Sequence, residues 1–495
     1  MSANDQPHYS LYIDGGWCEG GDGQVVETID PATGEAWATF ACASAADVER
    51  AVAAARRALW APAWRELSPS ARGRLLYRLA DLIVEHAETL GRVETRDSGK
   101  LAAETVAQTR YVADYYRYFA GLADKIEGSV LPIDKPDLLV FTEREPIGVV
   151  AAVVPWNAQM FLTATKLGPA LAAGCTVVLK ASELAPAPIL EFARLIEEAG
   201  FPPGVVSVIT GDAEHCAIPL TRHPQIDRIA FTGGSETARH VVRNSAENFA
   251  VLSLELGGKS PIIVFDDANL ESAVNGLIAG NWGASGQSCV AGSRALVQRG
   301  VHERLVEALI ERAERIRVGD PQDADTHMGP LCTVAQLEHI DRTLQAATAQ
   351  GAKVRTGGTR LTSLPGHYFP PTLVECSSPD TATLKTELFG PVMSLLPFDT
   401  EEEAVELAND SDFGLGSGVF TENLARAHRV ARRLRAGICW VNTYRAISPI
   451  APFGGYDRSG YGREAGLDSV LDYTRTRTTW INTSEQAMAD PFVMR

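Results

Sequence analysis

The chain has 495 residues, of which 45% are hydrophobic, so it can bury the cores of two or three ordinary domains. Its 62 acidic residues outnumber its 45 basic residues and leave a formal net charge of -17. Because a surface of that sign repels phosphate groups, we expect no nucleic-acid partner and favour chemistry on a small molecule.

The N-terminal residues lack the basic and apolar stretches of a targeting signal, and no later apolar run is long enough to cross a bilayer. These features favour a cytoplasmic protein with no membrane partner. The 8 cysteines are scattered, without a C-x-x-C pair or a Cys/His cluster, so we expect neither a disulfide framework nor a metal site.

Helical and strand-like segments follow one another along the first half of the chain. Residues 46–125 repeat apolar residues at helical spacing, which predicts helices. Beyond them, short β-branched runs alternate with helix-length segments, which predicts a parallel sheet in a Rossmann-like, cofactor-binding half. The G-x-G-x-x-G fingerprint is missing at its first turn, so a dinucleotide would bind without it. The predicted strands are residues 147–155, 175–182, 204–211 and 227–234.

A second α/β region is predicted for about residues 258–456. Two further segments, 129–146 and 470–486, alternate polar and β-favouring residues as strands with one exposed face do. Their edges need pairing, so we expect either assembly with another subunit or an ordinary surface hairpin. The strand candidates of the second α/β region are residues 295–300, 353–358, 390–398, 417–421 and 437–442.

One cysteine, Cys289 in GQSCVAGSR, has unusually small neighbours. A cysteine is more often inert packing than a nucleophile. Here, however, Gly286, Ser288, Ala291 and Gly292 leave room for a carbonyl group at the sulfur and for backbone N–H groups near its oxygen. The pattern therefore favours a reactive thiol at Cys289.

Other polar residues stand where chemistry is expected. Glu255 in VLSLELGG alternates away from the leucine face of its strand, which suits a general base, although a surface acid on an edge strand is the plainer alternative. Asn157 follows an apolar strand and is either a turn former or a neutral donor to an oxyanion. Lys180 and Glu183 follow the next strand, and they either begin a helix or contact ribose hydroxyls.

In this order, the motifs PWN, KASE, FTGGSE, LELGGKSP, GQSC, ELFGPV and PFGGYDRSGYGRE resemble those of the aldehyde dehydrogenase superfamily, of the NAD(P)-dependent, hydrolytic, non-CoA-acylating type. The resemblance covers about residues 10–482. It implies an α/β fold with a Rossmann-like cofactor domain, an α/β catalytic domain and a small β oligomerisation domain. The implied boundaries are 1–123 and 147–257 for the cofactor domain, 258–457 for the catalytic domain, and 124–146 and 470–495 for the oligomerisation segments.

The same resemblance implies roles for individual residues. Cys289 is the implied nucleophile and Glu255 the general base, while Asn157 and the Cys289 N–H hold an oxyanion. Lys166 and Glu464 match positions of a proton relay, with a helix-surface lysine and a loop acid as the plain alternatives. The implied cofactor contacts are Pro155, Trp156, Lys180, Glu183, Gly233, Gly234, Ser235, Glu387 and Phe389.

Departures from the family pattern bear on the cofactor. The carboxylate of Glu183 repels a 2′-phosphate, so NAD is favoured, with NADP as the alternative. Gly234 stands where the family has a serine, and Ser235 beside it is the candidate replacement.

Other departures bear on the substrate. Ala158 and Thr165 stand where relatives often carry bulky aromatic residues, which suggests a wider entrance. Arg445, in the loop before PFGG, suggests an aldehyde that carries a carboxylate, or a bulky oxygenated catabolic aldehyde. An exposed or inter-subunit arginine is the plain alternative.

The implied reaction is oxidation of an aldehyde to the carboxylic acid with NAD+. A thiohemiacetal and then a thioester form on Cys289, and water activated by Glu255 hydrolyses the thioester. The rival functions are a CoA-acylating semialdehyde dehydrogenase, against which Glu255 argues, and a catalytically idle binding protein of the same fold. We expect a homodimer or homotetramer.

Overall fold

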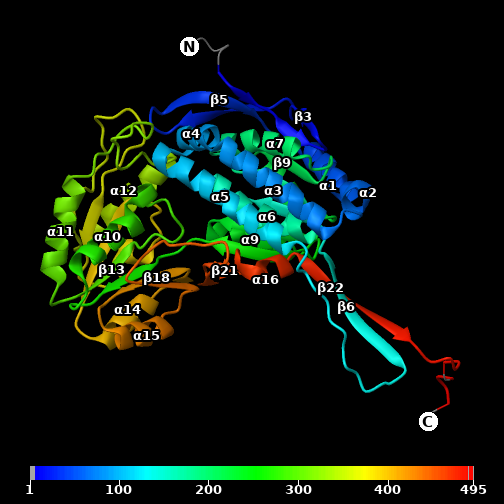
Figure 1. The fold of residues 1–495 in the computed structure, drawn as a ribbon. Coiled ribbons are helices and arrows are strands. Elements are labelled where there is room, and N and C mark those ends of the chain that lie inside the picture. Colours follow the sequence, from blue (N-terminus) through cyan, green and yellow to red (C-terminus); the bar gives the residue numbers. More distant parts are fainter. Residues whose placement is uncertain (1–5, 489, 494–495) are drawn as a thin grey trace.

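In a computed structural model of the chain, the structure describes residues 6–488 and 490–493. Residues 1–5 of the predicted cofactor domain and residues 489, 494 and 495 of the predicted oligomerisation segment lie outside that part. Two α/β lobes lie beside each other, and a two-stranded arm projects from one of them (Figure 1).

The helical prediction for residues 46–125 is confirmed. Ser44 begins the first helix with a capping box in which its side chain accepts from the Asp47 N–H and its own N–H is met by the Asp47 carboxylate. Gly99, with a φ of 79°, ends the fourth helix in the left-handed conformation that glycine adopts readily. The helices are α1 (Ala45–Trp60), α2 (Pro62–Arg65), α3 (Pro69–Glu85), α4 (Ala87–Ser98) and α5 (Ala102–Leu122).

The first lobe contains an 8-stranded sheet in the order β21-β11-β10-β7-β8-β9-β2-β3. Its five central strands run parallel, and their apolar residues are buried on both faces, as expected for continuous β-branched runs. All four strands predicted for this half are confirmed. The strands are β2 (Leu11–Ile13), β3 (Gly16–Cys18), β7 (Val149–Val153), β8 (Thr176–Ala181), β9 (Val206–Thr210), β10 (Arg228–Gly233), β11 (Val251–Leu256) and β21 (Gly460–Tyr461).

Helices cover both faces of this sheet and form two separate hydrophobic cores. One core joins the sheet to α3, α5 and two later long helices, and the other joins it to α1 and three shorter helical elements. This layering is the Rossmann-like arrangement predicted for this half. The later helices are α6 (Gln159–Ala173), α7 (Ala187–Ala199), the π-helix η1 (Ala213–Ala217), α8 (Ile218–Arg222) and α9 (Ser235–Asn244).

The second lobe contains a 7-stranded sheet in the order β14-β15-β16-β13-β12-β18-β19. All of its strands run parallel except β14, and the five strands predicted for this region are confirmed. The sequence did not predict β15, a four-residue strand that begins beside a Pro-Pro pair. The strands are β12 (Pro261–Val264), β13 (Arg294–Gln298), β14 (Lys353–Thr356), β15 (Thr372–Glu375), β16 (Val392–Phe398), β18 (Gly416–Phe420) and β19 (Ile438–Val441).

Two further cores cover the faces of this second sheet. The helical elements of this lobe and of the chain that follows it are α10 (Leu270–Asn281), the 3-10 turn η2 (Gly283–Gly286), α11 (His302–Glu314), α12 (Val334–Ala349), α13 (Ala382–Lys385), α14 (Glu401–Asn409), α15 (Leu424–Arg433) and α16 (Gly466–Leu471). The two sheets separate at Gly257–Gly258, although β21 returns to the first sheet. The domain boundaries themselves stay a prediction.

Small sheets complete the fold. A 3-stranded sheet of β1 (His8–Tyr9), β4 (Val25–Asp30) and β5 (Glu35–Ala41) was not predicted. The strands β17 (Phe413–Gly414) and β20 (Tyr456–Asp457) form a separate antiparallel pair. No helix among the described residues is long and apolar enough to span a bilayer.

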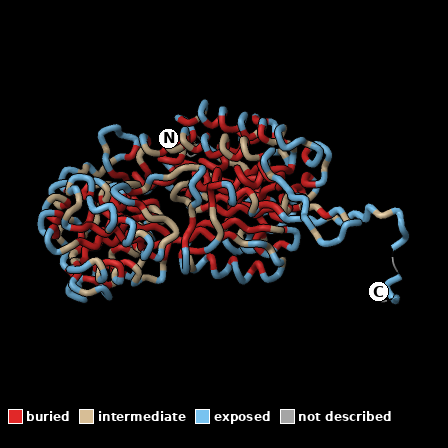
Figure 2. Tube along the Cα trace, turned by 60° about the horizontal axis from the view of Figure 1, so that its bottom comes forward, coloured by how far each residue is buried: buried red, intermediate tan, exposed pale blue. Residues whose placement is uncertain are grey.

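The projecting arm is a two-stranded antiparallel sheet of β6 (Leu138–Pro146) and β22 (Thr474–Asn482). The two strands pair over their whole length, which confirms the prediction for residues 138–146 and 474–482. The remainder of the predicted segments is not regular strand, because residues 129–137 form only a bridge at Val130 and residues 470–471 end a helix. Most of their residues are exposed, and the arm is largely pale blue in Figure 2. The side chain of Trp480 is among the exposed apolar groups. The strands therefore satisfy each other along one edge, residues 129–131 bond to part of the outer edge of β6, and the outer edge of β22 has no partner strand among the described residues.

Candidate active site

A cavity of about 280 Å³ lies where strands β7, β10 and β11 end. In parallel sheets, the carboxyl ends of strands are the usual ligand site. Residues from the second lobe close the cavity from the other side. The lining residues are Pro155, Trp156, Asn157, Leu162, Thr232, Gly233, Gly234, Glu255, Leu256, Gly257, Cys289, Gln336, His339, Glu387 and Phe389.

The turn that leads to Cys289 has an unusual backbone. Ala284, Ser285 and Gly286 have φ values of 52°, 53° and 73°, a run of left-handed conformations. At Gly286, an added Cβ would lie 2.1 Å from the Gly390 carbonyl oxygen, so this position has no room for a side chain. The glycine of GQSC is therefore required by the path of the chain.

Hydrogen bonds hold the same turn to both lobes. The side-chain amide of Asn157 donates to the Gln287 carbonyl oxygen at 3.1 Å. The side-chain oxygen of Gln287 accepts from the Cys332 N–H at 2.9 Å. No described residue accepts a hydrogen bond from the Cys289 N–H. A free N–H beside the Asn157 amide is the arrangement that an oxyanion needs.

The Cys289 thiol is enclosed by its neighbours, although part of the residue is accessible from the cavity. Burial raises the pKa of this thiol to about 12, with the carboxylates of Glu255 and Glu387 adding to the rise. The Val290 N–H and the Arg445 cation act in the opposite direction. The thiol is therefore neutral at pH 7 and needs a base before it can attack a carbonyl.

Glu255 lines the same cavity as Cys289 and is the candidate base. It is 3% exposed, on β11 between β10 and β21, so it is not a surface acid on an edge strand. Neither of its carboxylate oxygens has a hydrogen-bond partner among the described residues. Burial raises its pKa well above the ordinary value, Glu464 raises it further, and Lys166 and Arg463 lower it. A carboxylate in this state readily takes up a proton.

Behind Glu255 lies a buried cluster around Lys166. Its ammonium group pairs with Glu464 and donates to the Thr232 hydroxyl at 2.6 Å. Lys166 is fully buried in α6, so the helix-surface alternative does not hold. Thr165 donates to Glu464 at 2.7 Å and is also buried. The Thr165 side chain therefore faces this cluster, and the expectation that its small size widens an entrance stays a prediction.

The cavity also contains Glu387. The Glu387 carboxylate accepts a hydrogen bond from the Gly258 N–H at 2.9 Å. Burial raises the pKa of Glu387 to about 7, although that bond and Lys259 act to lower it. Trp156 and Phe389 meet edge to face, with ring centroids 5.4 Å apart. The cavity thus offers an aromatic wall and a carboxylate, groups that suit a nicotinamide ring and its ribose.

Other predicted cofactor residues lie at the margin of this cavity. Lys180 donates to Glu183 at 2.6 Å, and neither of them lines it. Gly233 and Gly234 do line it, and a Cβ added at Gly234 would meet open space. The hydroxyl of Ser235 donates to the Arg458 carbonyl oxygen at 3.1 Å. That Ser235 supplies the hydroxyl that Gly234 lacks stays a prediction, because its hydroxyl proton is used in this bond but its oxygen can still accept.

The predicted substrate residues lie apart from the cavity lining. Ala158 is half-buried and stands at the N-cap of α6. Arg445 donates to the Ala279 carbonyl oxygen at 3.1 Å, and its other terminal nitrogen is 3.9 Å from a carboxylate oxygen of Glu104. The sequence analysis did not identify Glu104.

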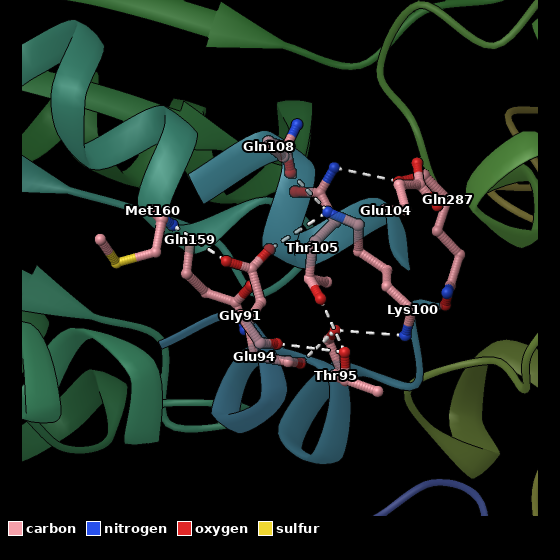
Figure 3. Close-up of polar contacts among 12 residues, drawn as sticks. Gly91, Glu94, Thr95, Lys100, Glu104, Thr105, Gln108, Gln159, Met160 and Gln287 are labelled. Atoms are coloured by element: carbon pink, nitrogen blue, oxygen red, sulfur yellow. Dashed lines mark hydrogen bonds and ion pairs between the residues drawn. The ribbon is translucent and has the colours of Figure 1, made fainter. Parts of the chain in front are cut away.

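A buried network that the sequence analysis missed supports the start of α6 (Figure 3). The ammonium group of Lys100 donates to Glu94 at 3.1 Å and to Gln108 at 2.7 Å. The other carboxylate oxygen of Glu94 accepts from the Met160 N–H at 3.5 Å. Both charged side chains are almost fully buried. In the sequence, Glu94 and Lys100 look like two ordinary surface charges, so nothing in it indicates that they are buried together.

These features define an enzyme with a cysteine nucleophile and a nucleotide-type pocket, and comparison with known proteins places it more closely. Residues 17–479 match the family model described as the aldehyde dehydrogenase family. The chain is 56% identical over 488 residues to (Z)-2-((N-methylformamido)methylene)-5-hydroxybutyrolactone dehydrogenase of Acinetobacter baylyi, covering 98% of this chain and 99% of that protein.

Solved structures of aldehyde dehydrogenases are also similar to this chain. Betaine aldehyde dehydrogenase from Staphylococcus aureus in complex with NAD+ is 37% identical, with a TM-score of 0.96 and coverage of 98% of this chain and 97% of that one. An aldehyde dehydrogenase from Bacillus cereus, also an NAD+ complex, is 40% identical, with a TM-score of 0.95 and coverage of 97% of each chain. The chain belongs to the aldehyde dehydrogenase family.

Proposed function

We propose that this aldehyde dehydrogenase oxidises a semialdehyde acid, an aldehyde that also carries a carboxylate, to the diacid with NAD+. The observation that carries the proposal is the meeting of Cys289, Glu255 and Asn157 in one cavity. A buried thiol, a carboxylate without partners and a free N–H are the groups that acyl chemistry at a carbonyl requires.

The substrate class is supported by the chemistry of one relative. The Acinetobacter protein is named for a 5-hydroxybutyrolactone. Such a lactone is the closed form of a four-carbon semialdehyde acid, because the carboxylate has added to the aldehyde of the same molecule. Its open form therefore carries an aldehyde at one end and a carboxylate at the other. A bulky catabolic aldehyde without the carboxylate is the alternative.

NAD fits the residues of the cavity. Glu387 would accept hydrogen bonds from hydroxyls of the nicotinamide ribose, and Phe389 and Trp156 would contact the ring. The paired Lys180 and Glu183 are placed for the adenosine ribose, where a carboxylate disfavours a 2′-phosphate. The two solved relatives described above were both bound to NAD+. When bound, NAD+ accepts the hydride that leaves the substrate carbon.

The reaction begins with the thiol. Glu255 takes the Cys289 proton, and the Lys166–Glu464 pair lies behind it to pass a proton on. The thiolate then adds to the aldehyde carbon, and the C–S bond forms as the C=O π bond opens. Asn157 and the Cys289 N–H stabilise the resulting oxyanion. Loss of hydride restores the C=O bond and leaves a thioester on the sulfur.

Hydrolysis returns the enzyme to its starting state. Glu255 takes a proton from water as the oxygen attacks the thioester carbon. The C–S bond breaks, the acid leaves, and the sulfur regains a proton. Because both carboxylate oxygens of Glu255 have no partner among the described residues, a water molecule can be bound there without displacing another group.

The test is NADH formation with 4-oxobutanoate, butanal and benzaldehyde, each offered with NAD+ and with NADP+. We expect 4-oxobutanoate with NAD+ to give the highest kcat/KM, with succinate as product. Cys289→Ala should abolish NADH formation with every aldehyde. Faster oxidation of both neutral aldehydes would contradict the substrate class, and acyl-CoA instead of free acid on addition of CoA would favour the CoA-acylating alternative.

The assembly is a separate part of the proposal. We infer a homodimer or homotetramer in which the outer edge of β22 contacts another copy of the chain. Among the described residues this edge has no partner strand, and the arm exposes apolar side chains such as Trp480, both of which isolated proteins usually cover. Light scattering of the purified protein measures the state directly, and a monomer would contradict the proposal.

A further inference from the structure

Arg445 lies against the segment that carries the nucleophile. A Cβ added at Gly283, in the turn before Cys289, would be 2.7 Å from an Arg445 nitrogen, so the guanidinium group covers this glycine. The neighbouring Tyr444 hydroxyl donates to the Val290 carbonyl oxygen at 3.0 Å. The Arg445 cation also lowers the pKa of the Cys289 thiol. The charge is therefore close enough to act on the reacting sulfur.

The backbone of Arg445 is unusual for its residue type. Its φ of 63° is a left-handed conformation that non-glycine residues seldom adopt. The bond from its guanidinium group to the Ala279 carbonyl oxygen, at the end of α10, holds the side chain in this direction. The position of the cation is thus set by the fold rather than by a freely moving side chain.

Helix α5 forms the facing wall. Glu104, Tyr111 and Tyr115 recur at helical spacing along one face of α5. Tyr111 donates to the Ile447 carbonyl oxygen at 2.9 Å, in the loop that carries Arg445. Tyr115 packs edge to face on Phe161 of α6, with centroids 5.1 Å apart. This face of α5 therefore meets both the Arg445 loop and α6.

The α5 wall and Arg445 are separate from the cofactor side of Cys289. None of Arg445, Glu104 and the two tyrosines lines the 280 Å³ cavity that holds the predicted cofactor contacts. Figure 3 draws Glu104 and Gln108 of α5 in one close-up with Gln287 of the cysteine turn. An aldehyde that meets the sulfur while the cofactor fills the cavity must approach from a different side, and the α5 wall and Arg445 border such a side.

Glu104 faces Arg445 without binding it tightly. Their nearest charged atoms are 3.9 Å apart, too long for a hydrogen bond, and their side chains are 30% and 26% exposed. An arginine has five N–H donors, and the Ala279 carbonyl oxygen is the one acceptor of this guanidinium group among the described residues. The remaining donors are free for a bidentate contact with a carboxylate.

Attraction over long range does not help such a substrate, because the chain has a net charge of -17. A local cation must therefore attract the substrate carboxylate, and an acid next to that cation must weaken the attraction. We propose that Glu104 is a specificity-determining residue that competes with the carboxylate of a semialdehyde acid for Arg445. The inference rests on the proposed function, since it takes the substrate to be an anion that Arg445 binds.

The experiment compares 4-oxobutanoate with butanal, which has the same length and no carboxylate. The readout is the ratio of their kcat/KM values. Glu104→Gln removes the competing charge and should raise the ratio about two- to fivefold through a lower KM for 4-oxobutanoate. Arg445→Gln should lower the ratio about tenfold or more. In the double variant, Glu104→Gln should have no further effect.

Asp114→Asn is the matched control, because it removes an exposed acid from the same helix that pairs with Arg117 and not with Arg445. It should leave the ratio unchanged. Arg445→Lys retains a cation and should retain more of the ratio than Arg445→Gln, so it keeps the test valid if the glutamine variant folds poorly.

The outcomes separate the inference from the function on which it rests. An unchanged or lowered ratio in Glu104→Gln overturns the inference, even where Arg445→Gln behaves as expected and the proposed function stands. Equal losses on both substrates in Arg445→Gln and Arg445→Lys would show that the arginine only supports the cysteine turn. Failure of the unmodified enzyme to prefer 4-oxobutanoate to butanal contradicts the proposed function itself.

Discussion

The two sides of Cys289 differ in burial and in how their charges are satisfied. On one side, Glu255, Lys166 and Glu464 are almost fully buried, and the Glu255 carboxylate has no hydrogen-bond partner among the described residues. On the other, Arg445 and Glu104 are partly exposed and only loosely paired. Removing one member of a buried ion pair is costly, whereas a partly exposed pair contributes little to stability. Under the proposed roles, the chemical groups lie in the core, and the groups that select the substrate lie where a substitution costs little stability.

The largest expected effect lies on the buried side. Glu255→Gln removes the base and should lower steady-state NADH formation by about 10³-fold, within the range for a general base. Because Glu255 also takes the Cys289 proton, both acylation and hydrolysis should slow, and we expect stopped-flow measurements to show no burst of NADH in the first turnover. Free acid released at the rate of the unmodified enzyme would contradict the role of Glu255.

The Lys166–Glu464 pair should move the pH profile. Lys166 lowers the pKa of Glu255 and Glu464 raises it. Glu255 acts as a base only when ionised, so the acidic limb of the kcat/KM profile follows its pKa. Lys166→Met should shift this limb to higher pH and Glu464→Gln to lower pH, each by about one unit. If the substitutions only damaged the structure, the acidic limb would stay where it is in both variants, or would shift in the same direction in both.

The smallest effect concerns the cofactor. Burial raises the pKa of Glu387 to about 7, so the carboxylate ionises as the pH rises through that value. An ionised oxygen is the stronger acceptor for a ribose hydroxyl, and the affinity for NAD+ should therefore rise a few-fold between about pH 6 and pH 8. Titration calorimetry measures it. Glu387→Gln should flatten the dependence, and Lys259→Met should move its midpoint upward because Lys259 lowers this pKa.

The sequence predicts most of the central strands because continuous β-branched runs between glycines and prolines leave few alternatives. It also singles out Cys289, whose small neighbours are adjacent in the chain. It could not show that Lys166 is buried, since charge alone favours a surface position and its partner Glu464 lies far along the chain. Glu104 was missed for the same reason, because only the folded chain brings it to Arg445. Strand β1 has only two residues, and β4 and β5 precede the helical region, outside the alternation of strands and helices on which the prediction relies.

The turn before Cys289 is bonded to Asn157 of one lobe and to Cys332 of the other. A small sliding of one lobe against the other should therefore displace the Cys289 sulfur from the Asn157 amide. During refolding, each lobe can complete its own sheet and still have an inactive cysteine. Activity should then return only in the last step, when the two lobes come together around this turn.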